Sequence, residues 1–152
     1  MRPFYLLLFI AISVLLFSCD PCKNLDCMPS KLDGTFRIVS AGTGTDLLFG
    51  PNKIYDKEQL KFYSIKGTDT TYFEPRTIKT EGTAYDSILV VRFSTQPEVA
   101  YLQLSNSDVD TLQISYTSTS SKCCGTISEI VNYRYNNATD IPGNKGTQEI
   151  KK

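Results

Sequence analysis

The stretch V-A-Y-L-Q-L-S-N-S-D-V-D-T-L-Q-I-S-Y-T, from Val99 to Thr117, decides the fold. In its second half polar and apolar residues alternate, which places Leu112, Ile114 and Tyr116 on one face of an extended chain. The turn-forming residues 106–108 join this run to the apolar run 99–104. Alternation with a period of two on both sides of a turn predicts two neighbouring β-strands.

The same pattern of short runs between turn residues continues outward in both directions. Residues 87–93 are the most apolar run and are expected at the centre of a sheet. Residues 126–135 are expected to place Ile127, Val131, Tyr133 and Tyr135 on one side. Further runs are expected at residues 35–40, 60–65, 70–74, 77–80 and, as a short edge strand, 146–151.

Helical signals are almost absent from this part of the chain. Only residues 56–59 suggest a helical turn, and residues 136–145 are predicted to be loose. Strand signals with turns every eight to twelve residues predict an all-β domain. We expect an antiparallel β-sandwich or small barrel of about eight or nine short strands over residues 33–152.

The composition limits the chemistry. The chain of 152 residues is long enough for one domain, and its formal net charge of zero gives no reason to expect a nucleic-acid partner. It contains no histidine, which removes the commonest general base and every imidazole metal site. We therefore expect a protein that is not an enzyme and that uses no cofactor or metal.

The N-terminus has the pattern of a secretory signal. Residues 4–17 are apolar apart from Ser13, and Arg2 precedes them. As a helix these fourteen residues would rise about 21 Å, too little for a hydrocarbon core of about 30 Å. A signal helix over residues 1–18 is predicted.

The residues that end this segment, Leu16-Phe17-Ser18-Cys19, resemble the lipobox of bacterial lipoproteins. Phe17 departs from the usual pattern, in which a smaller residue stands at that position. The resemblance implies that the chain is cut before Cys19, whose thiol receives a diacylglycerol group. Residues 19–32 then form a lipidated tether, and two or three acyl chains hold a protein stably on a membrane.

The wider texture of short Ser-, Thr-, Tyr- and Asn-rich strands looks like uncharacterised envelope lipoproteins of the Bacteroidota. The segment Asp46-Leu-Leu-Phe-Gly-Pro-Asn52 adds to that likeness. The resemblance implies an outer-membrane location. Because only scattered acids follow Cys19, the choice between the periplasmic and the extracellular face stays open.

Four cysteines remain once Cys19 is assigned to the lipid: Cys22, Cys27, Cys123 and Cys124. An even number in an oxidising compartment predicts disulfides. A bridge between adjacent cysteines is strained, so cross-links between the tether and the Cys-Cys pair are favoured over a local Cys22–Cys27 bridge. The sequence does not choose between the two cross-linked pairings.

Three further groups of residues are candidate sites. Thr70, Ser87 and Thr111 each follow an aspartate, as in the O-glycosylation acceptor of Bacteroidota proteins. Residues 106–110 could form a calcium loop but lack the regular spacing of acids, so a structural turn is favoured. Four tyrosines near strand ends are candidates for an exposed aromatic patch, although core or ordinary surface is favoured: Tyr55, Tyr63, Tyr72 and Tyr85.

These features favour a lipid-anchored envelope protein with a structural or accessory role, in contact with another envelope protein. The alternative is a glycan-binding module of a sugar-uptake or surface system. An enzyme that uses carboxylates is the least favoured function, because the sequence contains no evident pair of acids for it.

Overall fold

The computed structural model describes residues 22–82, 86–143 and 146–152. The predicted signal helix and Cys19 lie outside these residues. The described residues form ten strands and the all-β prediction is confirmed. The strands are β1 Asp33–Val39, β2 Lys61–Lys66, β3 Asp69–Phe73, β4 Arg76–Lys79, β5 Asp86–Arg92, β6 Val99–Ser105, β7 Asp108–Ser121, β8 Gly125–Tyr135, β9 Thr139–Pro142 and β10 Gln148–Lys151.

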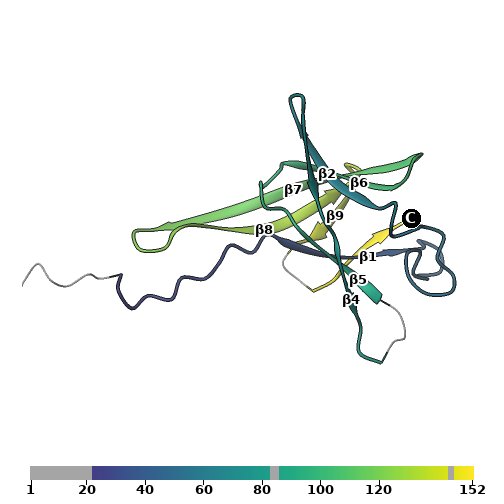
Figure 1. Ribbon diagram of the computed structural model, residues 1–152, viewed down its shortest axis with the longest axis horizontal. Helices are drawn as coiled ribbons and strands as arrows, with labels where there is room; N and C mark the ends of the chain where they lie inside the picture. The colour runs from purple at the N-terminus through teal and green to yellow at the C-terminus, as the bar shows by residue number, and fades with distance from the viewer. Residues whose placement is uncertain (1–21, 83–85, 144–145) are drawn as a thin grey trace, which may run out of the picture.

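Two sheets pack as a sandwich (Figure 1). One sheet has the strand order β10-β1-β5-β4 and the other has the order β3-β2-β6-β7-β8-β9. The apolar run 87–93 lies in an interior strand of the smaller sheet, β5, which pairs with both β1 and β4. Among the ten strands every pairing is antiparallel except that of β1 with β10, which is parallel.

The core forms where the inward faces of the two sheets meet. In β6 and β7 the residues Ala100, Leu102, Leu104, Leu112 and Ile114 are all buried, as the alternation of the Val99–Thr117 stretch predicts. They pack against a group of aromatic rings, and such rings provide much of the apolar area in a core of this size. That group consists of Phe36, Phe62, Phe73, Phe93 and Tyr133.

One prediction for β8 is wrong. Val131 was expected on the face of Tyr133, yet its side chain is 44% exposed. The pairing with β7 passes from Ser115–Asn132 to Tyr116–Ile130, so Val131 has no partner and forms a β-bulge. The extra residue reverses the alternation, and Ile130 rather than Val131 faces the core. Ile127, also predicted on the face of Tyr133, alternates with the buried Ser128 and Ile130 and is half-buried.

Two local predictions also differ from the structure. The segment 136–145 was expected to be loose, but its residues 139–142 form β9, which pairs with the end of β8. Residues 57–59 form a turn rather than a helix, and the Asp56 carboxylate accepts a hydrogen bond from the Glu58 amide.

Candidate binding surface

Three tyrosines form a row across the outer face of the larger sheet, which we call the tyrosine row. Tyr63 in β2 lies opposite Tyr72 in β3 and Tyr101 in β6. The rings of Tyr63 and Tyr101 are stacked with centroids 5.1 Å apart, and those of Tyr63 and Tyr72 are 5.9 Å apart. Tyr72, on the edge strand, is 64% exposed. The row faces outward because the neighbouring residues along the strands are in the core: Phe62, Phe73, Ala100 and Leu102.

Polar side chains share this face. The strand register places Thr111 beside Tyr101, and Lys61 opposite Gln103 one step along the strands. Aromatic rings bordered by hydroxyl, amide and ammonium groups can contact both the apolar and the hydroxyl surfaces of a sugar. Since Tyr63 and Tyr101 stack on each other, Tyr72 offers the most exposed ring of the row.

The tyrosines predicted from the sequence divide between different places. Tyr63 and Tyr72 belong to the row, Tyr55 belongs to a separate charged cluster, and Tyr85 lies outside the described residues. Tyr101 was missed. Its outward position follows from the alternation of 99–104, but only the pairing of β6 with β2 places it beside Tyr63.

A charged cluster lies where the C-terminal residue meets the β6–β7 turn. The Lys152 ammonium group donates to Asp108 Oδ1 at 2.6 Å and to Asp110 Oδ2 at 2.8 Å. The Tyr55 hydroxyl donates to Asp108 Oδ2 at 2.7 Å, and Asn136 Nδ2 donates to Asp110 Oδ1 at 2.7 Å. We call these five residues the Lys152 cluster.

Burial and hydrogen bonds in the cluster shift the pKa values of Tyr55, Asp108 and Lys152. Burial, followed by the hydrogen bond to Asp108, raises the pKa of Tyr55 to about 12. Burial opposes the ionisation of Asp108, but the hydrogen bonds from Lys152 and Tyr55 outweigh it and lower the pKa of that carboxyl group. Burial likewise disfavours the charge of Lys152, while the bonds to Asp108 and Asp110 raise its pKa overall.

The Lys152 cluster gives the two acids of the candidate calcium loop a partner within the chain. Asp108 and Asp110 direct their carboxylates at the Lys152 ammonium group, so a cation of the chain itself forms an ion pair with each of them. Within residues 22–82, 86–143 and 146–152, no group of three or more His, Cys, Asp or Glu side chains is placed to hold a metal ion. Residues 106 and 107 form the β6–β7 turn, and Asp108 begins β7.

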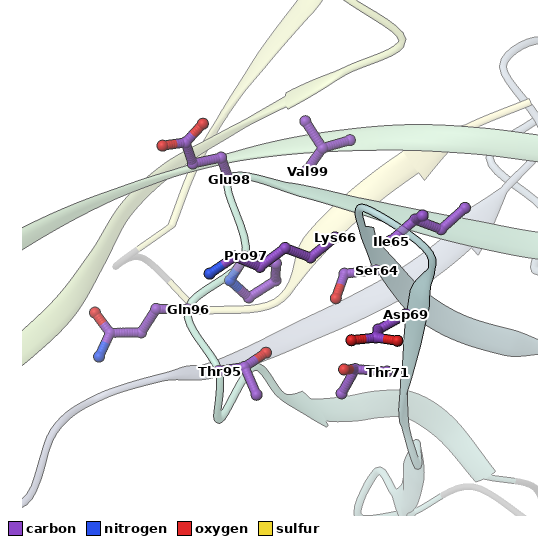
Figure 2. Close-up of a pocket in the computed structure, with 10 residues that line it drawn as sticks. All are labelled: Ser64, Ile65, Lys66, Asp69, Thr71, Thr95, Gln96, Pro97, Glu98 and Val99. Atoms are coloured by element: carbon purple, nitrogen blue, oxygen red, sulfur yellow. The ribbon is translucent and has the colours of Figure 1, made fainter.

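A cleft of about 650 Å³ lies between the β2–β3 hairpin and the loop before β6. Figure 2 shows Ser64, Asp69 and Thr71 directed from the hairpin toward the loop residues Thr95 and Pro97. Lys66 and Glu98 add one charge of each sign to its lining. The sequence patterns did not indicate this cleft, because its two walls are brought together only by the pairing of β2 with β6.

The three candidate glycosylation hydroxyls differ in their surroundings. Thr70 is exposed on the edge strand β3. Ser87 is half-buried and its hydroxyl is hydrogen-bonded to that of Thr80. The Thr111 hydroxyl lies 3.4 Å from Asn136 Oδ1. Of the three, Thr70 is thus the most accessible to a modifying enzyme.

The cysteines form two cross-links between the tether and the β7–β8 turn. Cys22 is bonded to Cys123, and Cys27 is bonded to Cys124. This is one of the two cross-linked pairings that the sequence left open. Cys19 lies outside the described residues and is the cysteine that the two disulfides leave over.

No family model matches the chain, and neither a curated protein nor a solved structure is significantly similar to it. The part of the chain that the structure describes contains no helix that is long and apolar enough to span a membrane.

Proposed function

We propose that this chain is a lipid-anchored envelope protein with a non-catalytic structural or accessory role, bound to another envelope protein. The observation that supports the proposal most is the fastening of the tether. Two disulfides join residues 22 and 27 to the β7–β8 turn, so this segment is held at the end of the β7–β8 hairpin. An anchor fastened in this way suits a protein that keeps a fixed position at a membrane. The outer membrane is the proposed location.

Fractionation of the Cys19→Ala variant tests the anchor. We expect this variant to leave the membrane fraction or to stay unprocessed, whereas the parent protein stays in the membrane fraction and takes up labelled palmitate. Unchanged processing and fractionation of the variant would contradict the anchor at Cys19. The Cys22→Ser/Cys123→Ser variant, which keeps Cys19, is the matched control and should remain on the membrane.

A pull-down tests the accessory role. The native lipoprotein, extracted in mild detergent, should co-purify with a membrane protein in stable proportion. Recovery of the lipoprotein alone, under conditions that preserve known envelope complexes, would count against this role.

The tyrosine row supports glycan binding as a second candidate function. Tyr72 is 64% exposed at the end of a three-ring row, and hydroxyl and amide side chains lie on the same face. Affinity electrophoresis against immobilised polysaccharides tests this candidate. Binding should be lost in Tyr72→Ala and retained in Ile78→Ala, which changes another exposed apolar side chain, 50% exposed, on the other sheet. Equal binding by both variants would show that Tyr72 does not take part in polysaccharide binding.

A further inference from the structure

The β7–β8 hairpin continues well beyond the core of the sandwich. We call residues 117–129 of this hairpin the arm, and Figure 1 shows it extending to the left of the two sheets. Its strand residues 117–121 are all serine or threonine and all exposed. At about 3.3 Å per residue these five residues alone extend about 17 Å. Hydroxyl pairs cross between the strands, from Ser118 to Ser128 at 2.9 Å and from Ser120 to Thr126 at 2.8 Å.

The tether runs along the arm and is fastened at both of its ends. Near the sandwich, Lys31 pairs with Glu129 in a parallel bridge, and the Ser128 amide donates to Ser30 Oγ at 3.0 Å. At the far end the two disulfides hold residues 22 and 27 at the turn. A two-stranded hairpin alone is marginally stable in water, so the fastened tether supplies the support that the arm otherwise lacks.

We infer that the arm is a stalk that holds the sandwich away from a lipid surface, in a set orientation. This inference rests on the proposed anchoring at Cys19. A free tether of thirteen residues would have an end-to-end distance of about 20 Å, and the domain could turn against the bilayer in any direction. With Cys22 fastened, only Asp20 and Pro21 separate the anchor from the arm, and the three steps from Cys19 to Cys22 span at most about 11 Å. The tip of the arm is therefore held next to the bilayer.

The chemistry of the tip suits a layer of lipid headgroups. Leu25 and Met28 are 55% and 65% exposed, although both are apolar. Leu25 lies within the segment 22–27 that the two disulfides hold at the turn, and Met28 follows it directly. That segment also carries Lys23 and Asp26, and Lys122 lies in the turn itself. Apolar side chains next to cations are the combination that inserts into the boundary between headgroups and acyl chains.

The opposite end of the molecule then faces away from the lipid. Strand β7 has fourteen residues, so its first residue, Asp108, lies about 45 Å from its last. The β6–β7 turn, the loop 40–59 and the C-terminal Lys152 gather at that far end (Figure 1). A partner protein would meet this end of the sandwich first.

Energy transfer to the membrane tests the orientation. A bioorthogonal dye-bearing residue replaces either Lys122 at the tip or Asn106 at the far end, and the lipoprotein is reconstituted into vesicles with acceptor-labelled headgroups. We expect transfer from position 122 to be several-fold stronger than from position 106. Equal transfer from both positions in the oxidised protein would overturn the inference.

Cysteine variants test the part played by the fastening. In the Cys22→Ser/Cys27→Ser variant, energy transfer from position 122 should exceed that from position 106 by less than in the parent protein. The reason is that the whole tether is released from the tip of the arm. The Cys27→Ser/Cys124→Ser variant keeps the link at residue 22 and should retain the difference. If the first variant also retains the full difference, the disulfides do not orient the domain. Circular dichroism on each variant verifies that the sandwich is folded.

A chemically attached anchor separates this inference from the proposed function. Cys19 is the cysteine outside the two disulfides, so a thiol-reactive lipid can be coupled to it in the oxidised chain that begins at residue 19. If cells do not lipidate Cys19, the proposed function fails while the coupled protein still reports the orientation. If the coupled protein shows equal transfer from both positions, the stalk is wrong even where cellular lipidation is found.

Discussion

Gly34 is a residue at which the core has no room for one more carbon atom. A Cβ built there would lie 2.5 Å from the Tyr133 hydroxyl oxygen and 2.6 Å from the Phe36 ring. The Tyr133 hydroxyl is itself buried, and it has no hydrogen-bond partner among the described residues. The aromatic core is thus closed around a glycine that adjoins an unsatisfied hydroxyl.

We expect Gly34→Ala to lower the free energy of unfolding by about 1–3 kcal/mol, because overpacking forces the surrounding rings to shift. Urea unfolding of the two proteins measures the difference. Gly42→Ala is the matched control, since no atom lies within 4 Å of its Cβ position, and it should be near neutral. Tyr133→Phe should be neutral or stabilising, because it removes a buried polar group that lacks a partner. A marked destabilisation by Tyr133→Phe would show that the hydroxyl is satisfied in solution.

The Lys152 cluster predicts a loss of stability in alkali. Tyr55 has its pKa raised to about 12, so between about pH 10 and pH 12 it stays neutral when folded and ionises when unfolded. Unfolding then releases a proton, and stability falls as the pH rises. The raised pKa of Lys152 acts in the same direction. Thermal unfolding from pH 9 to pH 12 should show a falling midpoint, with a shallower fall in Tyr55→Phe; an identical fall in that variant would contradict this role of Tyr55.

In acid the cluster acts through Asp108. Because the pKa of Asp108 is lowered in the folded protein, its ion pair contributes fully to the stability above about pH 4. This contribution is lost as the pH falls further and the folded carboxylate is protonated. Thermal midpoints measured from pH 6 to pH 2 should therefore fall, and Asp108→Asn should flatten that dependence. A steeper acid dependence in the variant would be inconsistent with the ion pair to Lys152.

At the scale of the elements, the two disulfides close nearly the same loop. They join positions 101 and 97 residues apart, and each closure of that length contributes about 4–5 kcal/mol in the chain-entropy model. Because the loops overlap almost entirely, the second cross-link adds only a small further constraint.

Removing one disulfide should therefore lower the free energy of unfolding by much less than half of what the two disulfides contribute together. We expect Cys27→Ser/Cys124→Ser to unfold in urea at a concentration close to that of the parent. The variant that lacks all four of these cysteines should lose about 4–5 kcal/mol. Equal and additive losses for the two pairs would indicate that strain or local packing, rather than the shared loop, determines the effect.

The tyrosine row is stabilised by contacts between strands. A double-mutant cycle on Tyr63→Ala and Tyr101→Ala should give a coupling of about 0.5–1.5 kcal/mol, as expected for stacked aromatic rings. The polar cross-strand pair Ser115 and Asn132 in the same sheet is the control and should couple more weakly. Coupling at Tyr63–Tyr101 no larger than in the control would show that the rings separate in solution.

At the scale of the whole molecule, the sandwich and the arm are stabilised in different ways. The sandwich buries a single core and leaves the tyrosine row and the cleft on its surface. The arm buries little and, apart from Ile127 and the two cysteines, is built of polar residues and glycine, so its order depends on cross-links to a distant part of the chain. Reduction of the disulfides should consequently loosen the arm before the sandwich, and hydrogen exchange should rise first in residues 117–129. Simultaneous exchange in β1 and β5 would contradict this division.

The sequence by itself determined the strand character of the chain and the direction in which most side chains face. Alternation is a local property, so the stretch from Val99 to Thr117 places its own apolar residues inward wherever it pairs. The even number of cysteines after Cys19 likewise indicated cross-links without structural help. The bulge at Val131 escaped prediction because only the partner strand shows that a residue lacks a pair.

Only the tertiary structure decided which distant residues meet. Strand order and register place Tyr101 beside Tyr63, join Cys22 to Cys123 rather than to Cys124, and bring Lys152 to Asp108. These contacts depend on how the two sheets stack and on where each strand enters its sheet, and no local spacing in the sequence encodes either. The physical reason is that one alternating pattern is compatible with many strand partners, and the shared core selects among them.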